Sequence, residues 1–206
     1  MILEACVEGV DQAIRAEKLG ATRIELCANL AADGLTPDHE TIKKVKEELT
    51  IPIRVIIRPR AGDFVYSEGE INTIKSSIDF CKEEGVEGVV FGMTTNNRSL
   101  DIDKINMLAN YAKPLKVTIH KAIDATDDPV KELGRLSKLG NIDAVLTSGK
   151  EPTVIEGEAC LKKMIALAGG QIEVIACGKV TVENLEAVHT AIGAKAYHGK
   201  KIVGEL

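Results

Sequence analysis

Short apolar runs alternate with longer amphipathic stretches along the whole chain, and this alternation restricts the fold more than any other feature. The short runs repeat every second residue, as β-strands do, and the longer stretches have the period of helices. The predicted strands span residues 2–6, 23–27, 53–58, 87–91, 115–120, 143–147, 172–176 and 195–198. The predicted helices span residues 8–19, 38–49, 68–84, 101–111, 128–139, 154–168 and 181–191.

A strand–helix unit that recurs through the chain indicates the α/β class with a parallel sheet and right-handed crossovers. Closure into a (β/α)8 TIM barrel is the simplest architecture, with the last helix missing or truncated because the sequence ends at Leu206. A doubly wound open sheet is the alternative, but the first turn, in ILEACVEGVDQA, lacks the glycines typical of that fold. Without a linker or low-complexity segment, residues 1–206 are predicted to form a single domain.

The charge and the cysteine content exclude several classes of function. A net charge of −5 argues against nucleic acid or an acidic membrane surface as partner, and an aromatic content of 3% argues against base stacking. Neither a signal peptide nor an apolar segment of the ~18 residues that span a bilayer is present. The five cysteines are widely spaced, so we expect no disulfide framework and a reduced, cytoplasmic protein.

The first two predicted strands end alike, with Glu4 and Cys6 on one and Glu25 and Cys27 on the other. A charge on the outer face of a barrel strand would lie beneath a helix without water, so these side chains are predicted to face inward. The same alternation predicts inward-facing residues on the third and fifth strands. They are Arg54, Ile56, Arg58, Lys116, Thr118 and His120. Barrel enzymes carry their chemistry at the C-terminal strand ends, where Cys6, Cys27, Arg58, His120, Ser148 and Cys177 fall.

Charges inside a barrel need partners, because an unpaired buried ion costs several kcal/mol. Two interpretations remain open for the inward glutamates Glu4 and Glu25. In one, Arg54 and Arg58 neutralise them in a purely structural ion network. In the other, the charges converge on a ligand pocket at the barrel mouth.

The pocket interpretation assigns roles to particular residues. Arg58 and Arg60 would hold a carboxylate or phosphate, and Ser148 would orient the anion. His120 would act as general acid–base, since a histidine titrates near neutrality, with Glu4 or Glu25 as the partner base. The turns ACGKVT and HGKK after the last two strands occupy the phosphate-binding corner of such barrels, and whether they bind phosphate stays open. The inward orientation of His198 is also open, because Tyr197 competes for that face.

The cysteines likewise allow two interpretations. Free cysteine often behaves as a small buried hydrophobe. Neighbouring strands lie about 4.8 Å apart, however, so Cys6 and Cys27 at matching heights could hold one soft metal ion. Two thiolates suit Cu(I) better than tetrahedral zinc. Cys177 is left open as a third ligand, whereas Cys81 and Cys160 lie in predicted helices and are interpreted as packing residues.

Several motifs in order resemble the CutC family, which is named for copper homeostasis. They are LEACV, ATRIELCANL, GLTP, IRPRAGDFVYSEGE, EGVVFGMTT, VTIHKAID, VLTSGKEPTVIEG, AGGQIEV and YHGKK. The resemblance implies a (β/α)8 barrel that forms a homodimer or larger homo-oligomer. It also implies Cu(I) binding through the pair matched by Cys6 and Cys27, beside a polar pocket matched by Glu4, Glu25, Arg58, His120 and Ser148.

The sequence therefore predicts a cytoplasmic copper-homeostasis protein of this family that binds Cu(I) at the C-terminal mouth of the barrel. The alternative is an enzyme that acts on a small phosphorylated or carboxylated metabolite by acid–base chemistry in the same pocket. In either case the partner is a copper ion or a small anion, and neither nucleic acid nor a membrane is expected.

Overall fold

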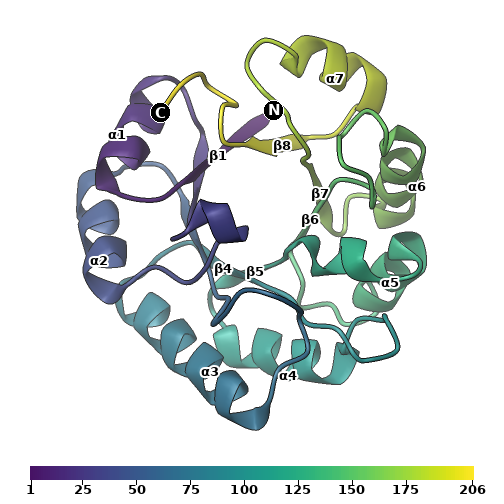
Figure 1. Ribbon diagram of the computed structural model, residues 1–206, viewed down its shortest axis with the longest axis horizontal. Helices are drawn as coiled ribbons and strands as arrows, with labels where there is room; N and C mark the ends of the chain where they lie inside the picture. The colour runs from purple at the N-terminus through teal and green to yellow at the C-terminus, as the bar shows by residue number, and fades with distance from the viewer.

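Eight parallel strands close into a barrel in the computed structural model, which describes residues 1–206. Each strand pairs with the next in sequence, and β8 pairs with β1, as Figure 1 shows from above. The strands are β1 (Ile2–Val7), β2 (Arg23–Leu26), β3 (Ile53–Ile56), β4 (Gly88–Phe91), β5 (Lys116–Ile119), β6 (Ala144–Thr147), β7 (Glu173–Ala176) and β8 (Ala196–Gly199).

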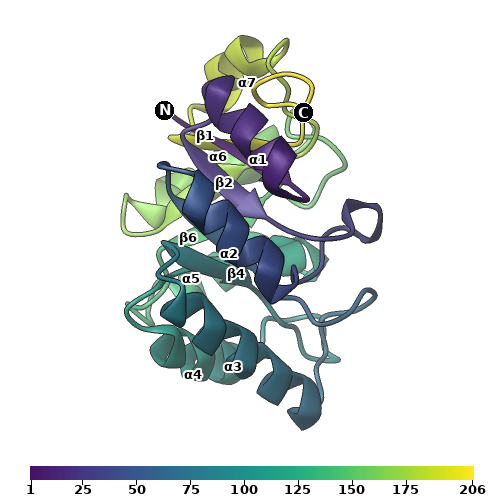
Figure 2. The same ribbon diagram turned by 90° about the vertical axis from the view of Figure 1, so that its left-hand side faces the viewer.

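Seven α-helices form a ring outside the strands, and Figure 2 shows three of them, α1, α2 and α3, along one side of the barrel. The helices are α1 (Val10–Lys18), α2 (His39–Glu48), α3 (Glu68–Glu83), α4 (Ile102–Ala112), α5 (Pro129–Leu136), α6 (Glu158–Ala168) and α7 (Leu185–Ile192). Two short 3-10 helices, η1 (Leu30–Ala32) and η2 (Lys121–Ala125), follow β2 and β5. No helix follows β8, so the predicted barrel with a missing last helix is confirmed. None of the helices has the length and apolar character that crossing a bilayer requires.

The observed bounds differ from the predicted ones by at most three residues, except at the starts of α6 and α7, which come later. In both cases the residues predicted to begin the helix are held by another strand-end loop. The Val154 N–H donates to the Gly178 carbonyl, and Thr181 forms a parallel bridge with Lys201. These contacts tie the turns after β6, β7 and β8 together above the barrel.

The alternation along the strands separates an outer core from an inner one, as predicted. Outward residues such as Ile24 and Leu26 belong to the large apolar core shared with the helices. Inward residues form two smaller groups, one of which contains Cys6, Cys27 and Ile56. Both inner groups reach the C-terminal end of the barrel, where a cavity opens between them and polar side chains.

Candidate functional site

A cavity of about 720 Å³ opens at the C-terminal ends of the strands. The strand ends and the loops that follow them build its walls. The lining side chains with the most reactive groups are Cys6, Glu25, Cys27, Arg58, His120 and His198. Three residues expected there, Glu4, Arg60 and Ser148, do not line the cavity.

Cys6 and Cys27 form a thiol pair in the wall of the cavity, with their Sγ atoms 3.4 Å apart. Their heights do not match as expected, because the register sets Cys6 opposite Glu25 and leaves Cys27 beyond the end of β2. The side chains nevertheless converge diagonally across the two strands. The Cys6 thiol donates to Glu25 Oε2 at 3.5 Å, and the Cys27 thiol donates to the Val7 carbonyl at 3.3 Å. The Cys27 hydrogen bond and burial hold the pKa of Cys6 well above its ordinary value, so this group is a neutral thiol at neutral pH.

His198 on β8 points into the barrel beside this pair. Its Nδ1 lies 2.9 Å from Glu4 Oε1, and its Nε2 lies 3.7 Å from Glu25 Oε2. Ligand atoms of Cys6, Glu25 and His198 all lie within 4.8 Å of one another. This set could therefore surround one metal ion. His198, whose orientation the sequence leaves open, belongs to it, whereas Cys27 lies outside it and contacts only the Cys6 end of the set through its Sγ atom.

The pKa values of His198 and of the two glutamates beside it are shifted in different directions. Burial alone would raise the pKa of Glu4, but the His198 hydrogen bond and the Arg23 charge lower it to about 2. Burial raises the pKa of Glu25, although the His198 charge opposes this. Burial would lower the pKa of His198, but the neighbouring carboxylates and Cys6 raise it well above its ordinary value. Glu4 and His198 are therefore an ion pair, with His198 in the cavity wall and Glu4 beneath it.

The structural ion network, one of the two interpretations open for the glutamates, has other partners than Arg54 and Arg58. Glu4 pairs with Arg23, which also contacts Glu173 at 2.7 Å. Arg54 contacts Glu87 at 3.0 Å and donates to a threonine hydroxyl on β5. These ion pairs lie in the barrel interior below the cavity, so Glu4 is a structural group there and only Glu25 lines the cavity.

Arg58 is 5% exposed, and no carboxylate lies within ion-pair distance of it. Its Nη1 donates to the carbonyls of Ala32, Asp33 and Gly34 at 2.8, 3.2 and 3.1 Å, and its Nη2 donates to the Gly62 carbonyl at 3.1 Å. Its Nε finds no acceptor. Arg58 therefore carries a buried positive charge that only carbonyl dipoles offset.

His120 follows β5 and caps η2, because its Nδ1 accepts the N–H of Ala122 at 3.1 Å. Its Nε2 has no partner. Burial and the Arg58 charge lower the pKa of His120 to about 3. The expected titration near neutrality is therefore wrong, and the ring is a neutral imidazole with its proton on Nε2.

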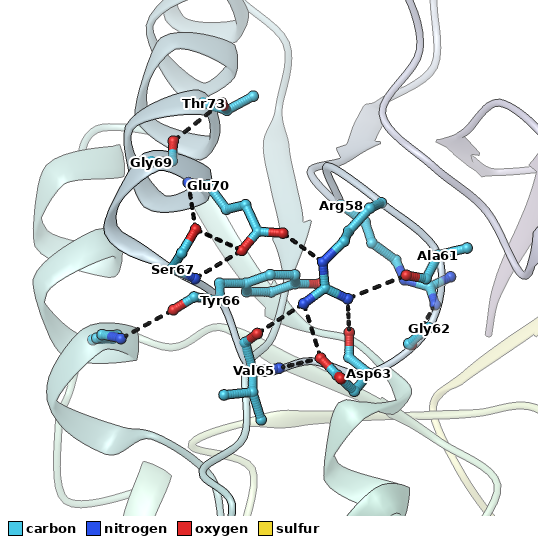
Figure 3. A network of polar contacts seen from close by, with 12 residues as sticks. Arg58, Ala61, Gly62, Asp63, Val65, Tyr66, Ser67, Gly69, Glu70 and Thr73 are labelled. Carbon is cyan, nitrogen blue, oxygen red and sulfur yellow. Dashed lines mark hydrogen bonds and ion pairs between the residues drawn. The ribbon is translucent and has the colours of Figure 1, made fainter.

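Arg60 lies in the loop between β3 and α3 and turns away from the cavity. Its guanidinium contacts Glu70, the Asp63 carboxylate at 2.9 Å and the Val65 carbonyl at 2.8 Å. Figure 3 shows this network, in which Ser67 and Glu70 also form the capping box that starts α3. Arg60 therefore holds the loop between β3 and α3 in place, and its guanidinium is not free for the expected contact with an anion.

Ser148 is also occupied by its own surroundings. Its hydroxyl oxygen lies 2.7 Å from the Glu151 carbonyl and 3.2 Å from the Asp124 carboxylate, the two acceptors for its single proton, and its N–H donates to Asp124 at 2.9 Å. Cys177 does line the cavity, but it lies in an apolar group with Leu146 and outside the ligand set around His198. Burial raises the pKa of the Cys177 thiol.

Comparison with known protein sequences identifies one family. The CutC family model matches residues 1–203. A "Copper homeostasis protein cutC homolog" of Homo sapiens is 40% identical over 197 residues, which cover 96% of this chain and 72% of that protein. A CutC family protein of Parabacteroides distasonis is 39% identical over 96% of this chain and 81% of its own length.

Two solved structures are similar in fold to this chain. The crystal structure of the CutC protein of Streptococcus agalactiae superimposes with a TM-score of 0.92 at 31% identity, covering 98% of this chain and 99% of that one. An N-acetylneuraminate lyase of Mycoplasma synoviae reaches a TM-score of 0.65 at 12% identity, over 98% of this chain and 69% of that one. The second likeness shows the barrel fold alone.

Proposed function

Since the chain belongs to the CutC family, we propose that it is a copper-homeostasis protein that binds Cu(I) at the mouth of its barrel through Cys6 and Cys27. The observation that carries the proposal is the 3.4 Å separation of the two Sγ atoms in the cavity wall. Metal–thiolate bonds are about 2.3 Å long for zinc, so two bonds of that order can reach one ion across this gap. Paired thiolates favour Cu(I) among the common metal ions.

His198 supplies a third ligand in this proposal. Its Nδ1 is engaged by Glu4, which leaves Nε2 on the side of Cys6 and Glu25. A carboxylate that orients a metal-binding imidazole in this way is a frequent arrangement in metal sites. On binding, the ion would replace the thiol protons of Cys6 and Cys27 and the Nε2 proton of His198, and one of the two thiolates would offset the single charge of Cu(I).

The experiment is an anaerobic Cu(I) titration of the reduced protein against a competing chelator. We expect tight one-to-one binding that disappears in the Cys6→Ser, Cys27→Ser double variant. The matched control is Cys160→Ser, Cys177→Ser, which also removes two thiols and should bind copper as the unmodified chain does. Equal binding by the two double variants would overturn the proposal.

The cytoplasmic location and the oligomeric state of the protein are part of the same proposal. All five cysteines are free, which fits the reducing cytoplasm. That the chain forms a homodimer stays a prediction of the family resemblance, and sedimentation velocity with and without Cu(I) would measure it.

A second candidate function is an enzyme that acts on a small phosphorylated or carboxylated metabolite. The cavity of about 720 Å³ lies within the range of small-molecule sites, roughly 300–1,000 Å³, and far exceeds the size of one ion. Its lining carries more positive than negative side chains, although the whole chain has a net charge of −5. The charged lining residues are Arg58, Lys121, Lys179, Lys200 and Lys201 against Glu25 and Asp33.

Thermal unfolding with a panel of phosphorylated and carboxylated metabolites tests this candidate. A ligand at ~100 times its dissociation constant adds about 2.7 kcal/mol to stability, which a melting curve resolves. Protection by none of the panel would count against an enzyme of this class and would leave copper binding untouched.

A further inference from the structure

Two N–H groups beside the cavity have no hydrogen-bond acceptor. One is Nε–H of Arg58, whose other nitrogens are occupied by carbonyls, and the second is Nε2–H of His120. The proton of His120 must sit on Nε2, because Nδ1 accepts the Ala122 N–H. Both side chains are 5% exposed. Buried donors without a partner are rare in folded proteins, so this pair needs an explanation.

The register brings the backbones of Arg58 and His120 to one level of the barrel. Arg54, Gly88 and Lys116 are paired across β3, β4 and β5. Four residues further along the same strands come Arg58, Gly92 and His120. A Cβ on Gly92 would lie 2.8 Å from His120 Nδ1. The glycine between them therefore leaves the room that the imidazole occupies above β4.

Phe64, from the loop between β3 and α3, packs on both side chains. Its ring centroid lies 4.9 Å from that of His120 and 5.1 Å from Arg58 Cζ. The ring offers Arg58 a weak cation–π contact but gives neither N–H an acceptor. Phe64 is itself only partly buried and lines the cavity. Phe64 thus contacts both residues and borders the cavity.

We propose that Arg58 Nε–H and His120 Nε2–H together bind one carboxylate group of a small organic acid, which takes the place of the Phe64 ring. The inference rests on the second candidate function and names its substrate class. A carboxylate brings two acceptor oxygens and one negative charge, which match two single donors and one guanidinium without a counter-ion. A phosphate dianion would bring a second charge and a third oxygen that this pair leaves unmatched.

The chain contains no tryptophan, so Phe64→Trp supplies a fluorescent reporter at the place that the acid would occupy. Acetate and pyruvate are titrated into this variant, with sodium chloride at matched ionic strength and inorganic phosphate as the other arms. We expect a saturable red shift of the emission with the two carboxylates and none with chloride. A second readout, on the unmodified chain, is a shift of the His120 Nε2–H proton resonance with the same titrants.

His120→Asn is the decisive variant, because its amide oxygen still accepts the Ala122 N–H while the Nε2–H donor is lost. It should weaken carboxylate binding at least tenfold, whereas the control His39→Asn, on a helix outside the cavity, should not change it. Binding that is equal in both variants, or a response to phosphate without one to carboxylates, would overturn the inference while a ligand site remains. If no anion binds at all, the second candidate function fails as well. Cu(I) titration of the same samples tests the copper proposal separately.

Discussion

Replacement of His120 by asparagine should make the protein less sensitive to mild acid. The imidazole is buried beside the Arg58 guanidinium, and burial with that charge lowers its pKa from 6.5 to about 3. In the unfolded chain the same histidine titrates near its ordinary pKa of about 6.5. Between these two values the unfolded state binds a proton that the folded state does not.

The sign and size of the effect follow from this difference. The contribution of a neutral His120 to stability is fully present above pH 6.5 and is lost progressively as the pH falls toward 3. Each pH unit inside that window is worth up to about 1.4 kcal/mol. Between pH 7.5 and pH 5.0, His120 should account for about 2 kcal/mol of lost unfolding free energy.

Urea unfolding of the unmodified chain and of His120→Asn at both pH values measures this contribution. Other titrating groups act in both proteins, so only the difference between the two losses is used. The unmodified chain should lose about 2 kcal/mol more than the variant. Equal losses would refute the account of His120 as a buried neutral imidazole under the field of Arg58.

Three further substitutions test contacts that hold the loops and turns around the C-terminal end of the barrel. Gly92→Ala should lower the unfolding free energy by about 1–3 kcal/mol, because its Cβ would overlap the His120 ring, and an unchanged urea midpoint would contradict this. Asp124→Asn should cost about 1.5–3 kcal/mol in the same assay, since the carboxylate accepts the Ser148 N–H and hydroxyl, while Cu(I) affinity should stay the same. Ser67→Ala breaks the capping box of α3 and should cost about 1 kcal/mol in thermal unfolding; a change in Cu(I) affinity would show that the loop couples to the metal site.

The barrel and the faces of its strands could be predicted because both depend on local patterns. An alternating strand such as Arg23–Leu26 has one charged and one apolar face, and only the apolar face can lie under a helix. The same alternation predicts that Cys6, Glu25 and Cys27 face the interior of the barrel. Their grouping at the cavity follows from the same parity.

The partners of the inward charges could not be predicted, since they depend on register and on loop conformation. Glu4 forms its ion pair with Arg23 on the adjacent strand rather than with Arg54 or Arg58. Arg58 is held by the carbonyls of the turn around η1, where Asn29 and Asp33 have positive φ values of 51° and 61°. Nothing in the sequence indicates that this turn would reach an arginine on the next strand.

The sequence leaves the orientation of the His198 side chain open for a different reason. Tyr197 and His198 are neighbours, and each is a plausible inward residue at a barrel mouth. The structure buries Tyr197 in the outer core, where its hydroxyl accepts the Ala194 N–H at 2.9 Å, and this turns His198 inward. The small Ala196, which shares the inward face with His198, is the signal in the sequence that favours this orientation.

The most direct test of the copper proposal is X-ray absorption at the copper edge of the anaerobic one-to-one Cu(I) complex. Two sulfur neighbours and one nitrogen are predicted, from Cys6, Cys27 and His198, and the nitrogen should vanish in His198→Asn. A first shell made of nitrogen and oxygen alone would contradict copper binding by the thiol pair. Cys6 and Cys27 would then be packing residues, and the cavity would be left to the organic acid.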